Sequence, residues 1–233
     1  MKRKLVFYTA FNTFLSNKLT RRPKSGRPHP ATTTEWTKKR LDIWRRFTLK
    51  SILNQDYKDF IYVLLLNPKL RLITDPLLPK LEDDRIIYSY EDEPLIRGLQ
   101  EYDELVMALL DSDDMYSHDA GTLMMNCPGP WMYFKGGYAL DMKRWRLYPY
   151  NTRGSGPFYA QLLPGNKLTH FNRTKHKPCH EDILKFKSVR LSNGKFCVGI
   201  HGRNTSSTMR MPHIGKKNLN LKILKEFGIS MEV

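Results

Sequence analysis

The chain has 233 residues, of which 40% are hydrophobic, and it carries a formal net charge of +16. This length suits one α/β domain with a substantial core, and the hydrophobic content excludes a disordered chain. No apolar run approaches the roughly 18 residues that a membrane span needs, so we expect no transmembrane segment.

The first predicted element is a strand at residues 5–10, which is rich in β-branched and aromatic side chains. The basic residues at the start of the chain and the short apolar stretch after them superficially resemble a signal peptide. However, the apolar stretch is too short and no small-residue cleavage pattern follows it. Residues 12–34 contain prolines, a glycine and scattered basic residues, so we expect a long basic loop there.

Thr34 is expected to cap a helix from Trp36 to Asn54, in which apolar side chains recur at three- and four-residue spacing. Strands are predicted at residues 60–66, 85–90 and 105–110, and the continuous apolar runs are typical of a parallel sheet buried on both faces. This alternation predicts one doubly wound, Rossmann-like α/β domain spanning residues 1–233. Ligands of such sheets bind at the carboxyl ends of the strands.

The second half of the chain is less regular. Strands are predicted at residues 131–135 and 196–200, and Gly136-Gly137 is interpreted as a turn or a bulge. Residues 209–233 are expected to form a basic tail or a helix. Within them, residues 216–227 are the one candidate for an amphipathic membrane-binding helix, with a thin apolar face.

Cysteine usage favours a reducing compartment, the cytoplasm of a bacterium or of a phage-infected host. The three cysteines are odd in number and far apart, which gives no disulfide framework. A cluster of possible zinc ligands lacks the usual finger spacing, so we do not favour zinc. Its members are His170, His176, Cys179 and His180.

Charge is distributed unevenly along the chain. Residues 1–34 carry eight basic residues and no acid, residues 35–119 carry 12 bases against 18 acids, and residues 120–233 carry 19 bases against five acids. Basic flanks of this kind attract nucleotide diphosphates, nucleic acid or an anionic membrane.

Three carboxylates, those of Asp111, Asp113 and Asp114, follow the predicted strand at 105–110. Acids this close repel one another unless a cation or hydrogen-bond donors satisfy them, and hard oxygen ligands suit Mg²⁺ or Mn²⁺. The alternative is a solvated turn, which aspartate also favours.

The segment Asp111-Ser112-Asp113 resembles the DxD motif of GT-A glycosyltransferases. Other stretches are similar to family-2-type enzymes of the rhamnosyltransferase kind, and the likeness runs patchily from about residue 5 to 208. In chain order these stretches are residues 9–12, 46–55, 60–67, 137–138 and 201–207.

The resemblance implies a single GT-A domain with a mixed central sheet, and a metal-dependent glycosyltransferase that uses a UDP- or other NDP-sugar as donor. It implies Mn²⁺ or Mg²⁺ held by Asp113 and His201, with Asp111 as a further ligand nearer the ribose or a metal-bound water. Two departures affect the donor site: Asn67-Pro68 stands where the family commonly has acidic residues, and Thr9-Ala10 lacks an arginine. The implied nucleotide-contacting residues are Thr9, Asn12, Asn67, Asp92, Asp111, Ser112, Arg203, Asn204, Thr205 and Ser206.

For an inverting transfer, the resemblance points to Asp182 as the base that takes the proton of the acceptor hydroxyl, with Glu181 and His180 as substitutes. Acids at the start of a helix are also favoured by the helix dipole alone. A retaining mechanism stays open.

The sequence does not identify the acceptor, and it leaves three interpretations open. The charge favours a hydroxymethylated base in DNA, stacked by interleaved aromatic side chains. A cell-envelope glycan or lipid-linked sugar, with peripheral membrane contact, is the alternative within the enzyme class. The third is a non-enzymatic, basic nucleic-acid-binding module. The aromatic candidates are Trp131, Tyr133, Trp145, Tyr148 and Tyr150.

Overall fold

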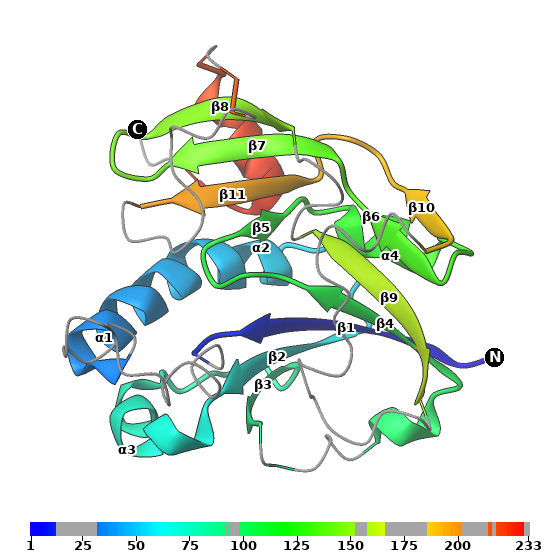
Figure 1. Ribbon diagram of the computed structural model, residues 1–233, viewed down its shortest axis with the longest axis horizontal. Coiled ribbons are helices and arrows are strands. Elements are labelled where there is room, and N and C mark those ends of the chain that lie inside the picture. The colour runs from blue at the N-terminus through cyan, green and yellow to red at the C-terminus, as the bar shows by residue number, and fades with distance from the viewer. Residues whose placement is uncertain are drawn as a thin grey trace.

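Two β-sheets, with a long helical segment between them, form the framework of the protein (Figure 1). The computed structural model describes residues 1–12, 32–91, 93, 98–151, 158–165, 186–201, 214–215 and 218–230. The fold is mixed α/β with a central seven-stranded mixed sheet, which confirms the predicted fold class at that level.

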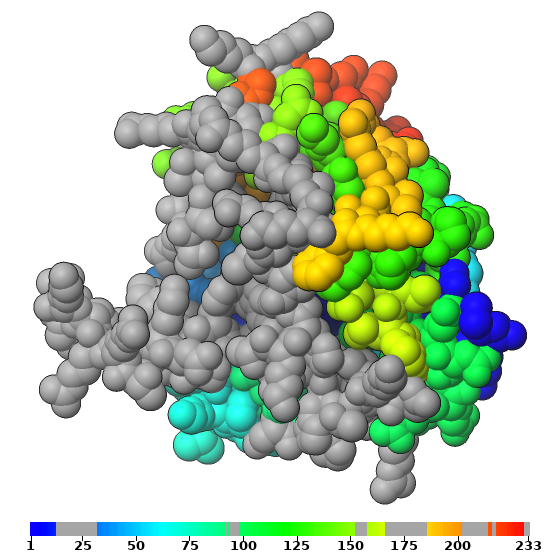
Figure 2. Space-filling model, turned by 45° about the vertical axis from the view of Figure 1, so that its right-hand side comes forward, coloured from blue at the N-terminus to red at the C-terminus, as the bar shows by residue number. Residues whose placement is uncertain are grey.

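The larger sheet has a parallel half and a mixed half, in the order β10-β6-β9-β4-β1-β2-β3. The parallel half contains β1 (Arg3–Ala10), β2 (Phe60–Leu66), β3 (Ile86–Tyr90) and β4 (Glu104–Leu109). Beyond β4 come β9 (Tyr159–Pro164), which is antiparallel to it, then β6 (Trp131–Tyr133) and β10 (Ser188–Arg190). Figure 2 shows β9 (yellow-green) and β10 (gold) on the surface at this side of the sheet.

The helical segment comprises α1 (Thr34–Ile43), the π-helix η3 (Trp44–Thr48) and α2 (Leu49–Leu53). Its cap is Thr33 and not Thr34, because the Thr33 hydroxyl accepts the Trp36 N–H at 3.2 Å. Trp44 and Ile52 are fully buried against β1 and β2, as the apolar periodicity predicts.

Short elements complete the parallel half. The 3₁₀ helix η4 (Pro68–Leu70), α3 (Arg71–Thr74) and the 3₁₀ helix η5 (Asp75–Leu77) connect β2 to β3. A further 3₁₀ helix, η6 (Leu99–Glu101), precedes β4, and Leu99 packs on the second face of the sheet.

The second sheet was not predicted as a unit. It contains β5 (Met115–Tyr116), β11 (Phe196–Ile200), β7 (Gly136–Asp141) and β8 (Arg146–Asn151), and α4 (Ala120–Met125) follows β5. The interpretation of Gly136-Gly137 as a turn or a bulge is wrong, since both residues begin β7 and pair with β8 in an unbroken register. A Cβ on Gly137 would lie 2.5 Å from the Phe196 carbonyl oxygen, so close strand packing explains that glycine.

The candidate amphipathic segment contains the 3₁₀ helix η9 (Leu221–Phe227). Leu224 and Phe227 are fully buried and pack with Met115 and Leu140 of the second sheet. This apolar face belongs to the core and is not available to a membrane. No helix in the described part of the chain combines the length and apolar character that crossing a bilayer requires.

The five aromatic residues proposed to stack a base do not share one sheet. Trp131 and Tyr133 lie on β6, whereas Tyr148 and Tyr150 lie on β8, and Trp145 directly precedes β8. Tyr150 is also buried, edge-on to Phe196 with ring centroids 5.9 Å apart. These residues therefore do not form one stacking surface.

Candidate functional site

The aspartate cluster lies at the carboxyl-terminal edge of the parallel strands, as predicted. β4 ends at Leu109, and residues 111–114 make a turn in which the Asp114 N–H donates to the Asp111 carbonyl at 3.1 Å. Ser112, Asp113 and Asp114 are buried, whereas Asp111 is partly exposed. The turn lies between the two sheets, because β5 of the second sheet begins one residue later, at Met115.

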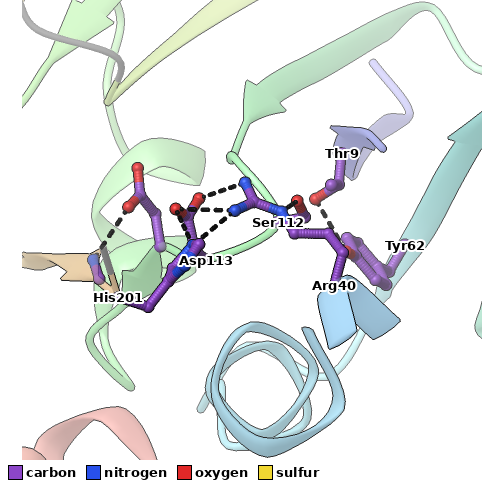
Figure 3. A network of polar contacts seen from close by, with 8 residues as sticks. Thr9, Arg40, Tyr62, Ser112, Asp113 and His201 are labelled. Atoms are coloured by element: carbon purple, nitrogen blue, oxygen red, sulfur yellow. Dashed lines mark hydrogen bonds and ion pairs between the residues drawn. The ribbon is translucent and has the colours of Figure 1, made fainter. Parts of the chain in front are cut away.

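Arg40 of α1 organises this turn (Figure 3). Its Nη2 donates to Asp113 Oδ1 at 2.8 Å and its Nη1 to Asp113 Oδ2 at 3.1 Å, which forms a two-pronged ion pair. Its Nε donates to Ser112 Oγ at 2.6 Å. The Arg40 and Asp113 side chains are 16% and 7% exposed, so this pair is largely withdrawn from water.

His201 joins the same group from the second sheet. It directly follows β11, and its Nε2 lies 3.2 Å from Asp113 Oδ2 and 2.7 Å from Arg40 Nη1. A guanidinium has no lone pair, so Arg40 is the donor in this contact and His201 Nε2 the acceptor. One nitrogen of Arg40 thus holds a carboxylate oxygen and an imidazole nitrogen together.

The pKa values of the neighbouring carboxyl groups of Asp113 and Asp114 are shifted in opposite directions. Burial opposes ionisation of Asp113, but the charge of Arg40, the contact with His201 and the hydrogen bonds from Arg40 together outweigh burial and lower the pKa of that carboxyl. Burial, together with the charges of Asp113 and Asp111, raises the pKa of Asp114 well above its usual value. Asp114 Oδ1 accepts the Gly199 N–H at 3.1 Å, so this carboxyl connects the turn to β11.

Gly199 sets the distance between the turn and β11. A Cβ at this position would lie 2.1 Å from the Asp113 carbonyl oxygen, which is far inside contact distance. Only glycine permits this approach, and the approach brings His201, two residues later, to Asp113.

Three residues implied in nucleotide binding have protein partners. Thr9 is fully buried and accepts the Tyr62 hydroxyl at 2.8 Å, as Figure 3 shows. Asn12 and Asn67, also buried, bind each other: the Asn67 N–H donates to Asn12 Oδ1 at 2.7 Å. They join the ends of β1 and β2 beside the aspartate turn.

Several implied site residues lie outside the described residues, and the structure says nothing of them. The proposed bases Asp182 and Glu181 are among these, as are His180 and the other candidate zinc ligands. The implied nucleotide contacts in this group are Asp92, Arg203, Asn204, Thr205 and Ser206.

Of the implied metal ligands, the structure brings Asp113 and His201 into contact and places Asp111 on the same turn. Within the described ranges, no group of three or more His, Cys, Asp or Glu side chains is arranged to hold a metal ion. Among the described residues, the implied ligands that lie in direct contact are the Asp113 carboxylate and the His201 imidazole.

Sequence reasoning missed Arg40. The available signal was its spacing: Arg40 is four residues from both Trp36 and Trp44, and therefore lies on the helix face that packs on the sheet. A cation on the inward face of an amphipathic helix needs a buried anion, and in this structure that anion is Asp113.

Compared with known proteins, the chain matches no protein-family model and no curated protein sequence.

Proposed function

We propose that the protein is a glycosyltransferase that takes a sugar from a nucleotide-sugar donor and binds a divalent ion through Asp113 and His201. The observation that carries the proposal is the 3.2 Å contact between these two side chains, which lie 88 residues apart in the sequence. The sequence resemblance implies these two residues as metal ligands, and their contact lies at the edge of the sheet where ligands bind.

The chemistry of the pair supports a metal site. Mg²⁺ is usually bound by one or two carboxylates, with substrate phosphates and water as its other ligands, so the protein need not supply a full set. Asp111, on the same turn and partly exposed, is available to a metal-bound water or to the ribose. When bound, such an ion acts as a Lewis acid that neutralises the diphosphate leaving group.

The topology supports a single GT-A domain. The four parallel strands place the ends of β1, β2 and β4 at one edge, and the aspartate turn follows β4, next to β1 at the centre of the parallel half. The Asn12–Asn67 pair fixes the ends of β1 and β2 relative to each other at this edge.

For the acceptor, we propose a hydroxymethylated base in DNA, since an excess of 16 positive charges favours a polyanion. Asp182 stays our proposed base. Envelope glycans and lipid-linked sugars are the alternative acceptors to compare with hydroxymethylated DNA.

The proposal is tested by thermal melting with a panel of nucleotide-sugars, with and without Mn²⁺, followed by assays of sugar transfer. Mn²⁺ with the correct donor should raise the melting temperature by several degrees, because a ligand that binds the folded state stabilises it by mass action. EDTA should abolish both this shift and the transfer.

The decisive variant is Asp113→Asn, which keeps the shape of the side chain and removes its charge. It should lose the Mn²⁺-dependent shift and reduce transfer at least about 100-fold, whereas Asp42→Asn, an exposed acid on α1, should behave like the wild type. A fully active Asp113→Asn enzyme would refute the proposed site.

A further inference from the structure

We infer that Arg40 is a built-in competitor of the divalent ion: its guanidinium occupies the ligand atoms of Asp113 and His201 and must withdraw before a metal binds. The inference rests on the proposed function of this site and adds a regulatory residue to it.

The guanidinium uses the atoms that a metal would need. Both carboxylate oxygens of Asp113 accept from it, at 2.8 and 3.1 Å, and His201 Nε2 accepts at 2.7 Å. The lone pair through which a neutral imidazole binds metal is the one that His201 offers to Arg40. Asp113 Oδ2 and His201 Nε2 lie 3.2 Å apart, and Arg40 Nη1 contacts both of them.

A divalent ion and the guanidinium cannot share this position. Both are cations, and the site is largely shielded from the water that would screen their repulsion. Arg40 has a long side chain that is partly exposed, and its Cζ lies 6.0 Å from the centroid of the Trp36 ring, which offers the guanidinium a second partner.

The donor diphosphate would favour replacement of the Arg40 guanidinium by the divalent ion. When metal and nucleotide arrive together, the displaced guanidinium meets phosphate oxygens, which are favourable partners for its planar fork. Arg40 therefore weakens metal binding to the free protein and couples metal binding to nucleotide binding. Coupling between two ligands is typically about 5- to 150-fold in affinity.

The test is a Mn²⁺ titration of the purified full chain, followed by the electron paramagnetic resonance signal of the free ion, with and without UDP. Arg40→Gln should bind Mn²⁺ at least about 10-fold more tightly than the wild type without UDP. UDP should strengthen Mn²⁺ binding to the wild type by about 10-fold or more, and this gain should shrink in Arg40→Gln.

Three further variants make the test specific. Arg46→Gln removes an exposed arginine of the same helical segment and should match the wild type. Arg40→Gln with Asp113→Asn should lose the gain in affinity. If Arg40→Gln does not fold because Asp113 loses its partner, Arg40→Lys retains a cation there, cannot reach three acceptors, and should show a smaller gain.

Unchanged or weaker Mn²⁺ binding in both Arg40 variants would overturn the inference, even in an active transferase. Tighter Mn²⁺ binding in a protein that transfers no sugar from any donor would support the inference and refute the proposed function. The two failures are therefore distinguishable.

Discussion

Asp113 and Asp114 are adjacent, yet they perform different tasks because the turn points them at different partners. Asp113 meets a guanidinium and stays ionised, whereas Asp114 meets the backbone amide of Gly199 and has a raised pKa. One carboxylate therefore provides charge to the site, and the other holds the second sheet against the turn.

The close packing of Gly199 against the Asp113 backbone leads to a prediction about a single residue. In Gly199→Ala the added Cβ collides with the Asp113 backbone, so β11 must shift, at a cost of about 2 kcal/mol or more in the free energy of unfolding. Chemical denaturation measures this loss. The shift should also move His201 from Asp113 and weaken Mn²⁺ binding.

Gly136→Ala is the matched control, because the nearest atoms to its Cβ would belong to the Asn193 and Asn151 side chains, at 3.1–3.3 Å, and these can rotate away. Equal costs for the two alanine variants would contradict the explanation.

At this scale the sequence predicted Asp113 and His201 and missed Arg40. These two proposed ligands stand in short motifs that directly follow predicted strands, so local sequence locates them. Arg40 is identified only when the helix face is known to turn toward the aspartate turn, which is information about packing between distant segments.

Among the elements, the end of α2 is fixed by one buried side chain, Gln55. Its amide nitrogen donates to the carbonyls of Ser51 and Ser117 at 3.0 and 2.8 Å, and its carbonyl accepts the Gly121 N–H at 2.9 Å. Gln55 therefore joins α2 to β5 and α4.

We expect Gln55→Ala to lower the free energy of unfolding by about 3 kcal/mol, because it leaves three buried backbone groups without their partner. Denaturant titration provides the measurement, with the exposed Gln100→Ala as control. A loss below about 1 kcal/mol would show that water replaces the amide at little cost.

The predictability of the elements follows their burial. β2 and β4 are continuous apolar runs in the centre of the sheet, and they form nearly where the sequence predicts them. β7 and β8 were missed because they contain Gly136, Gly137 and Pro149, residues that usually indicate turns. Here the glycines permit close packing, and Pro149 lies on β8, at the edge of the second sheet.

Over the whole molecule, the separation of charge complements the proposed site. The segment with more acids than bases, residues 35–119, includes the aspartate turn, whereas the flanking segments carry 27 of the 39 basic residues. The proposed polyanionic acceptor would thus be attracted by the flanking segments and repelled by the acids of the turn, which would be left to the proposed metal ion and diphosphate.

For the proposed DNA acceptor, this separation of charge predicts a salt-dependent affinity. Its affinity for a duplex that contains hydroxymethylated bases should fall by about 10-fold or more between about 50 and 200 mM salt, because basic side chains release counterions from the phosphates. Fluorescence anisotropy measures the binding.

Asp113→Asn should bind the duplex as the wild type does and yet fail to glycosylate it, which separates a transferase from a module that only binds nucleic acid. Salt-independent DNA binding, together with transfer to a lipid-linked or envelope acceptor, would contradict the proposal that DNA is the acceptor and would favour an acceptor at the membrane surface. The proposed roles of the donor site and its two metal ligands would not be affected by that result.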